Sequence, residues 1–234
     1  MKKILFLFIS FTYLFAQTET DKFSQAFSAF ENNNFSLALR LFKEVTVTGK
    51  LEQQKLSSAK FYSAECFLNL DQLDAAAVEF ESFLDEYRFS NYKPTVLYKL
   101  GTVYFTKREY RKARERLTTL TTEFPFSEFH GSSFYWIGET YASENKFVEA
   151  EENFREAIAN KKTNKYITNS VYSLAQLYEK TGDYSSAISN YDELLTYYKQ
   201  SPLAPKAQLR IGICYFNQKD YDNAILELTD SHPS

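Results

Sequence analysis

The sequence has 234 residues, with 27 basic and 30 acidic side chains and a formal net charge of −3 at pH 7. A mildly acidic chain without a basic stripe is not typical of nucleic-acid-binding proteins, which neutralise phosphates with clustered lysine and arginine. The chain has only 2 cysteines and 2 histidines, and they form no cluster with the spacing of metal ligands. We therefore expect no nucleic-acid partner, no metal site and no cofactor.

Residues 1–16 have the pattern of a secretory signal peptide. Lys2 and Lys3 give a positive start, and the run from Ile4 to Phe15 is almost wholly apolar. As a helix this run would be ~18 Å long, shorter than the ~30 Å core of a membrane. A buried first helix is the alternative. We expect export to the periplasm with cleavage after Ala16, and neither a membrane span nor a lipid anchor in the mature chain.

Residues 171–198 show the pattern that the rest of the chain repeats. Apolar residues at helical spacing indicate two short amphipathic helices, one on each side of Gly182. Asp183 directly follows this glycine and is placed to cap the second helix, because its side chain can accept from free backbone N–H groups there. The segment therefore predicts a helix–turn–helix unit.

This unit recurs with a period of 37 residues. Five successive copies hold a small residue in the first helix and an alanine twelve residues later, where two antiparallel helices would cross closely. An earlier copy with Phe35, Ala38 and Phe42 is shifted by one residue. A fixed period of this length predicts a helical-repeat solenoid. The small residues are Ala64, Gly101, Gly138, Ala175 and Gly212, and the alanines are Ala76, Ala113, Ala150, Ala187 and Ala224.

These positions, together with the aromatic residues on either side of the turn, resemble the tetratricopeptide repeat family, whose basic unit has about 34 residues. The resemblance implies an all-α, right-handed superhelical solenoid of about six helix–turn–helix repeats. We place the three additional residues per repeat in the linkers, where Pro94 and Pro205 fall at the expected starts of the following helices. The array is expected to cover residues 17–234, with repeats at approximately 19–56, 57–93, 94–130, 131–167, 168–204 and 205–234.

The linkers carry a second resemblance. Segments such as YYKQSPLAPKA are similar to the linkers of bacterial envelope repeat proteins, namely the outer-membrane assembly factor of the barrel-insertion machinery and the periplasmic repeat protein of the Tol-Pal system. This similarity implies a role in the cell envelope. The chain departs from the lipid-anchored assembly factor because no cysteine directly follows the apolar run of residues 4–15.

The two cysteines hold the same position in repeats that are four apart, at Cys66 and Cys214. Stacked repeats would place these residues on the order of 40 Å from each other, whereas a disulfide needs Cα atoms within about 7 Å. We expect both to be buried free thiols that pack as small apolar residues.

The first helix of each repeat is expected to line the concave binding surface that such arrays present. Two adjacent side chains per repeat are candidates for this surface, and Tyr135 and Trp136 are the pair for which exposure is most expected. Tyrosine and tryptophan are frequent interface anchors, because they are large, rigid and partly polar. The alternative is that individual rings pack in the core. The candidate partner-binding residues are Phe61, Tyr62, Tyr98, Lys99, Tyr135, Trp136, Tyr172 and Arg210.

No catalytic motif is present in the sequence: it contains no glycine-rich phosphate loop, no G-x-S-x-G and no H-E-x-x-H. The sequence therefore favours a non-enzymatic scaffold for protein–protein interaction in the bacterial envelope, in envelope or outer-membrane assembly. The alternative is an accessory subunit for polysaccharide synthesis or export, with a glycan lying along the aromatic residues.

The last repeat is expected to leave an apolar edge uncovered. Repeat arrays normally end in a solvating helix that covers this edge. Ile211, Ile225 and Leu228 are expected to lie bare there, since no capping helix follows in the sequence. An uncovered apolar face of this kind usually marks an interface. We expect self-association or a partner at this edge, or a natural chain that continues past Ser234.

Overall fold

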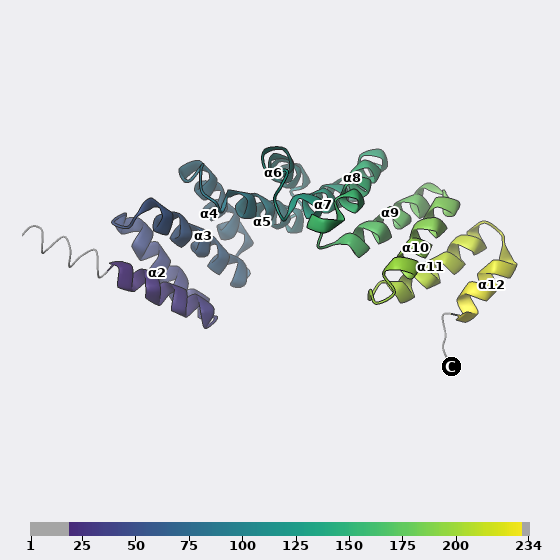
Figure 1. Ribbon diagram of the computed structural model, residues 1–234, viewed down its shortest axis with the longest axis horizontal. Helices are drawn as coiled ribbons and strands as arrows, with labels where there is room; N and C mark the ends of the chain where they lie inside the picture. Colours follow the sequence, from purple (N-terminus) through teal and green to yellow (C-terminus); the bar gives the residue numbers. More distant parts are fainter. Residues whose placement is uncertain (1–18, 231–234) are drawn as a thin grey trace, which may run out of the picture. The chain divides into compact units, whose positions relative to one another are not determined.

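The computed structural model describes residues 19–230, and all regular secondary structure within that range is helical (Figure 1). The predicted all-α repeat fold is confirmed, whereas the predicted signal peptide lies outside the described residues. Among the described residues, no helix combines the length and the apolar character that a membrane span requires.

The chain divides into two compact units, with the division after Arg108. The N-terminal unit contains a helix over residues 19–31, α2 (Phe35–Thr48), α3 (Gln53–Asn69), α4 (Leu73–Glu86) and α5 (Lys93–Thr106). The C-terminal unit contains α6 (Tyr110–Glu123), α7 (His130–Ser143), α8 (Phe147–Ala159), the 3₁₀ helix η1 (Lys161–Thr163), α9 (Ile167–Thr181), α10 (Tyr184–Tyr197), α11 (Ala204–Asn217) and α12 (Tyr221–Asp230).

The repeat period is visible in the backbone of the turns. One residue per repeat, two positions before the second helix, adopts a left-handed conformation with φ between 57° and 83°. The N–H of the following residue closes the first helix by donating back to a carbonyl five residues earlier, as from Asp183 to Tyr178 at 2.9 Å. These left-handed residues are Asp71, Arg108, Asn145, Gly182 and Lys219. The corresponding Asn33 precedes Asp71 by one position more than the period, which confirms the shift of the earliest copy.

The predicted helix starts are also confirmed. Asp183 caps α10 by accepting a hydrogen bond from the backbone N–H of Ser186 at 3.1 Å. Pro94 and Pro205 lie in the first turns of α5 and α11, where the missing proline N–H has no helical partner to lose.

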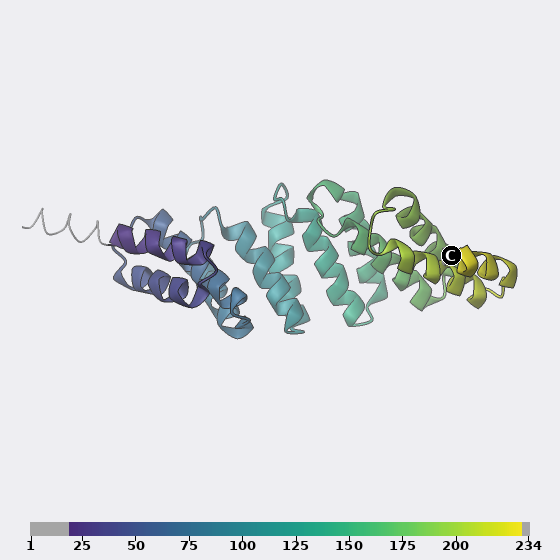
Figure 2. The same cartoon turned by 90° about the horizontal axis from the view of Figure 1, so that it is seen from below.

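Small residues allow the paired helices to approach closely. α7 and α8 lie side by side (Figures 1 and 2), and a Cβ atom added at Gly138 would lie 2.7 Å from the Phe154 ring. Ala150, on the same side of α8, is fully buried. The predicted close crossing is therefore present in this repeat.

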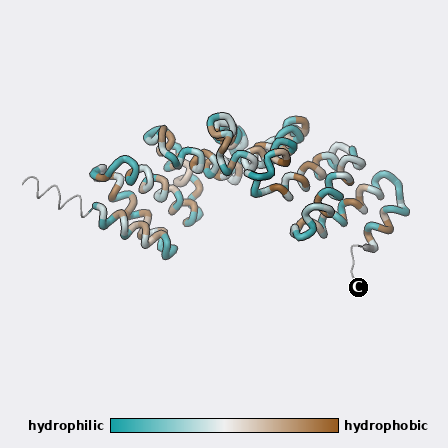
Figure 3. The backbone as a smooth tube through the Cα atoms, in the orientation of Figure 1, coloured by the Kyte–Doolittle hydropathy of each residue, from teal (hydrophilic) through white to brown (hydrophobic). Residues whose placement is uncertain are grey.

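Apolar and polar residues alternate along the helices, so each helix has a side that packs and a side that meets solvent (Figure 3). In the C-terminal unit one continuous core joins α7 to α11, and its largest fully buried side chains include Tyr191 and Phe154. In the N-terminal unit the rings of Phe27, Phe42 and Tyr62 lie within 6 Å of one another. Clustered rings let short helices bury a large apolar area.

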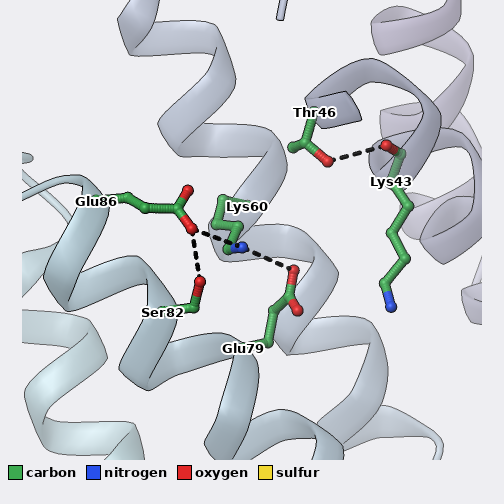
Figure 4. A network of polar contacts seen from close by, with 6 residues as sticks. All are labelled: Lys43, Thr46, Lys60, Glu79, Ser82 and Glu86. Atoms are coloured by element: carbon green, nitrogen blue, oxygen red, sulfur yellow. Dashed lines mark hydrogen bonds and ion pairs between the residues drawn. The ribbon is translucent and has the colours of Figure 1, made fainter. Parts of the chain in front are cut away.

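A polar network connects α3 to α4 (Figure 4). Lys60 of α3 lies 3.6 Å from Glu79 and 3.3 Å from Glu86, and Ser82 donates to Glu86 at 2.6 Å. The Lys60 and Glu79 side chains are each 15% exposed. Glu86 is 49% exposed. Because two acids share one largely buried lysine, the network holds the two helices more firmly than an isolated surface ion pair does.

Both cysteines are buried and free, as predicted. Burial raises the pKa of the Cys66 thiol to about 12 and also raises that of Cys214. Neither thiol is ionised near neutral pH, so both side chains pack as small apolar residues.

Candidate partner-binding surfaces

Two of the predicted surface rings are buried by aromatic residues from the linkers. In the N-terminal unit, Phe61 is 6% exposed and stacks on Tyr92, with ring centroids 4.5 Å apart and ring planes 15° apart. In the C-terminal unit, Tyr135 is 7% exposed and stacks on Tyr166 at 4.9 Å and 12°. The expected exposure of Tyr135 is therefore wrong, because a ring from the loop before α9 covers it.

The covering residues, Tyr92 and Tyr166, lie two periods of the repeat apart. They were not among the residues predicted from the sequence, although a large apolar or aromatic residue recurs at this linker position. Its occupants are Tyr92, Phe129, Tyr166 and Leu203.

The other predicted rings are partly exposed, including the direct neighbours of the two buried ones. Trp136 meets Tyr166 edge to face at 5.2 Å, and Tyr62 packs in the same way against Phe27 at 4.5 Å. Tyr172 lies edge to face with Tyr191 at 5.4 Å. Tyr98 of α5 is also partly exposed. Trp136, Tyr62 and Tyr172 therefore each have one side fixed by packing and another side that solvent or a partner can reach.

Each of the two predicted basic residues forms an ion pair with an acidic residue on the first helix of the preceding repeat. Lys99 of α5 contacts Glu65 of α3, with Nζ to Oε2 at 2.9 Å. Arg210 of α11 forms a two-point pair with Glu179 of α9, and its Nε–H donates to Oε2 at 2.8 Å. Tyr191 also donates to Glu179 at 3.2 Å. These cations therefore connect consecutive repeats.

Glu139 of α7 is a further acidic residue, and it was not predicted from the sequence. It accepts a hydrogen bond from Ser173 Oγ of α9 at 2.7 Å. Burial raises the pKa of its carboxyl, and the opposing effects of the Ser173 hydrogen bond and of Lys180 do not restore the ordinary value. Glu139 lines a cavity of about 160 Å³ within the C-terminal unit.

A larger cavity of about 370 Å³ lies in the N-terminal unit, between the start of α3 and the loop that joins α4 to α5. Ser57, Glu86 and Tyr92 are among the residues that line it, and so is Phe89, whose side chain is fully exposed. Polar, charged and aromatic residues all line this cavity, and they form no arrangement that indicates one class of ligand.

Of the chain's 2 histidines, His130 lies within the described residues; it begins α7 and packs edge to face on Phe134 at 5.1 Å. Burial lowers the pKa of its imidazole, against the opposite effect of Glu156. Within residues 19–230, no group of three or more histidine, cysteine and acidic side chains gathers in a way that could hold a metal ion.

The terminal edge of the C-terminal unit differs in part from the prediction. Ile211 is 1% exposed and packs in the core, so the expectation that it lies bare is wrong. Leu228 packs against Gly212. Ile225 and Leu226 of α12 are 63% and 55% exposed. The apolar surface at this edge is therefore formed by the outer side of α12.

Comparison with known proteins identifies the repeat. A family model described as tetratricopeptide repeat matches residues 98–165 and 172–232, more than half of the chain, and a second model of the same description matches residues 58–90. No curated protein matches the sequence.

Three solved structures illustrate the likeness in fold. A tetratricopeptide repeat protein from Parabacteroides merdae is 16% identical with a TM-score of 0.71, over 93% of this chain and 82% of that chain. The C-terminal part of a repeat protein from Cytophaga hutchinsonii is 16% identical with a TM-score of 0.72, over 89% and 78%. PilF of Pseudomonas aeruginosa is 15% identical with a TM-score of 0.64, over 93% of both chains.

Proposed function

Because the chain belongs to the tetratricopeptide repeat family, we propose that it is a non-enzymatic scaffold of the bacterial cell envelope. It binds a partner protein along the partly exposed surface of its first helices, in envelope or outer-membrane assembly. Tetratricopeptide repeat proteins generally mediate protein–protein interaction, and stacked repeats present extended binding surfaces.

The observation that carries this proposal is a packed, partly exposed aromatic ring at the same repeat position in the N-terminal and in the C-terminal unit. Tyr62 and Trp136 lie two periods of the repeat apart. Each is fixed from one side by aromatic contacts and is partly exposed on the other. A large ring that is already ordered loses little side-chain entropy on binding, which suits it to anchor an interface.

The envelope location is supported by the signal-like pattern of residues 1–16 and by the resemblance of the linkers to those of envelope repeat proteins. Expression in a two-membraned bacterium, followed by fractionation and N-terminal sequencing, tests this location. A periplasmic product that begins at Gln17 supports export. A cytoplasmic product that retains Met1 overturns it.

The binding role is tested by affinity capture from envelope extract with the wild type, a Trp136→Ala variant and a Tyr197→Ala variant. Tyr197 of α10 is 75% exposed and lies outside the first helices, so it is a matched aromatic control. Loss of a binding anchor costs about 2 kcal/mol or more, roughly a 30-fold loss of affinity. A protein partner lost only with Trp136→Ala supports the scaffold. Retention on cell-wall or exopolysaccharide resin in place of a protein partner favours the glycan-binding alternative.

The outer side of α12 is a second contact surface under this proposal. Ile225 is 63% exposed, whereas Ile188, its equivalent one repeat earlier, is 8% exposed in the core that includes α11. The same kind of side chain is therefore covered in one repeat and uncovered in the next. We propose that the protein self-associates or docks a partner through α12.

A further inference from the structure

Two residue pairs occupy the same place in two repeats but differ in one charge. Glu65 and Lys99 form an ion pair between α3 and α5 in the N-terminal unit, 2.9 Å from oxygen to nitrogen. Glu139 and Ser173, each two periods further along the sequence, form the equivalent contact between α7 and α9 at 2.7 Å. The acid is retained in the second pair, but the cation is replaced by a neutral hydroxyl.

A cavity in the C-terminal unit is lined by both Glu139 and Ser173, the residue that stands at the position equivalent to Lys99. We call this cavity, of about 160 Å³, the Glu139 pocket. Its apolar lining includes Ala142, Phe147 and Leu177, and its polar lining includes Glu139, Ser173 and Lys180. The space therefore combines an apolar wall with one partly buried carboxylate.

The carboxylate in this pocket lacks the neutralisation that Glu65 receives. Among the described residues, Glu139 accepts its hydrogen bond from Ser173 and forms no ion pair. Lys180 lines the same pocket, but its side chain is exposed, and its attraction does not offset the effect of burial on the carboxyl. A partly buried carboxylate that forms no ion pair is an unfavourable arrangement, which a positive charge bound in direct contact relieves.

We propose that the Glu139 pocket binds the cationic side chain of a lysine or arginine from the partner protein. The methylene stem packs against Phe147 and Leu177, as long basic side chains do on apolar surfaces, and the charged head donates to the Glu139 carboxylate. The bound side chain thus takes the role that Lys99 has beside Glu65. This inference rests on the proposed binding of a partner along the first helices and specifies the chemistry of one contact.

The first test uses two peptides, N-acetylated and C-amidated Ala-Ala-Lys-Ala-Ala and the same peptide with norleucine, which keeps the apolar stem and removes the charge. Binding is followed by nuclear magnetic resonance shifts of Ser173 and its neighbours, with peptide up to about 10 mM, a range that covers the weak affinity expected for one side chain. We expect the lysine peptide to bind at least about tenfold more tightly than the norleucine peptide. Equal binding of both peptides, or no shift with either, overturns the proposal.

Two variants should abolish the site, one by removing the carboxylate charge and the other by pairing it with an internal cation. Glu139→Gln deletes the charge with little change in shape, and Ser173→Lys supplies an internal cation in the manner of Lys99. Both should reduce binding of the lysine peptide at least about tenfold, and Ser173→Lys should not lower the thermal midpoint. Glu65→Gln, the same change at the equivalent position of the N-terminal unit, should leave this binding unchanged. Binding that persists in both pocket variants overturns the proposal.

Failure of this inference can be distinguished from failure of the proposed function. If Trp136→Ala abolishes capture of the protein partner while Glu139→Gln and Ser173→Lys leave capture and peptide binding intact, the scaffold proposal stands and the pocket proposal fails.

Discussion

Tyr166 lies flat against Tyr135, with ring centroids 4.9 Å apart and ring planes 12° apart. Tyr166 comes from the loop that precedes α9, whereas Tyr135 lies on α7. The linker ring covers Tyr135 and leaves the neighbouring Trp136 partly exposed. The linkers therefore decide which ring of each adjacent pair is core and which is available to a partner.

Removing this cover should destabilise the C-terminal unit. We expect Tyr166→Ala to lower the free energy of unfolding by about 2 kcal/mol, because a stacked pair and part of an apolar surface are lost. Tyr166→Phe keeps the ring and should cost less than about 1 kcal/mol. Urea unfolding followed by circular dichroism measures both. Equal midpoints for Tyr166→Ala and the wild type would show that the stack contributes nothing to stability.

The left-handed turn position offers a reciprocal pair of substitutions. Lys219 has φ 65°, and Gly182, at the same position one repeat earlier, has φ 83°. We expect Lys219→Gly to stabilise the protein by about 0.5–1 kcal/mol, because glycine adopts this conformation without steric cost. Gly182→Ala should destabilise it by about 1 kcal/mol, since an added Cβ meets nothing within 4 Å and only the backbone conformation opposes it. Thermal unfolding of both variants should therefore show shifts of opposite sign; shifts of the same sign would contradict this account.

The close crossing of α7 and α8 is tested at Gly138. We expect Gly138→Ala to cost about 1–3 kcal/mol, because the new methyl group would lie 2.7 Å from the fully buried Phe154 ring. Gly212→Ala is the matched control: its methyl group would meet the Leu228 side chain, which is only partly buried and can move aside. Helix propensity then favours alanine by about 1 kcal/mol. Chemical unfolding compares the two, and equal losses would contradict the packing argument.

The repeat fold follows from the sequence because its determinants are local and periodic. The turn at Gly182, the cap at Asp183 and the prolines that begin α5 and α11 act within a few residues of where they stand. Each therefore predicts a helix boundary on its own.

The surface follows from the sequence only in part. The covering of Tyr135 depends on the path of a distant linker, and the pairing of Arg210 with Glu179 depends on the register of two neighbouring helices. Neither relation is encoded in a short window of sequence. The recurring ring at Tyr92 and Tyr166 was the available signal, because its spacing of two periods marks it as part of the repeat.

Stability at neutral pH should increase when the charge of Glu139 is removed. Burial raises the pKa of this carboxyl in the folded protein above its ordinary value of 4.5, so the folded state favours the protonated form. The contribution of Glu139 to stability is complete below pH 4.5 and is lost as the pH rises through the raised folded pKa. We therefore expect the stability of Glu139→Gln relative to the wild type to be higher at pH 7 than at pH 4. Urea unfolding at both pH values measures this, and an unchanged or reversed difference would contradict it.

Association through α12 is tested with Ile225→Glu. Ile225 is 63% exposed and lies beside Leu226, which is 55% exposed, so a carboxylate at this position would have to lose its hydration in any apolar contact. We expect the wild type to form a larger species as its concentration rises and Ile225→Glu to remain monomeric. Val148→Glu is the control, because Val148 is 69% exposed on α8, away from this edge. Sedimentation velocity over a wide concentration range distinguishes the three proteins. The proposal fails if the wild type stays monomeric at every concentration and Ile225→Glu weakens the binding of no partner. This apolar side of α12 would then not be an interface.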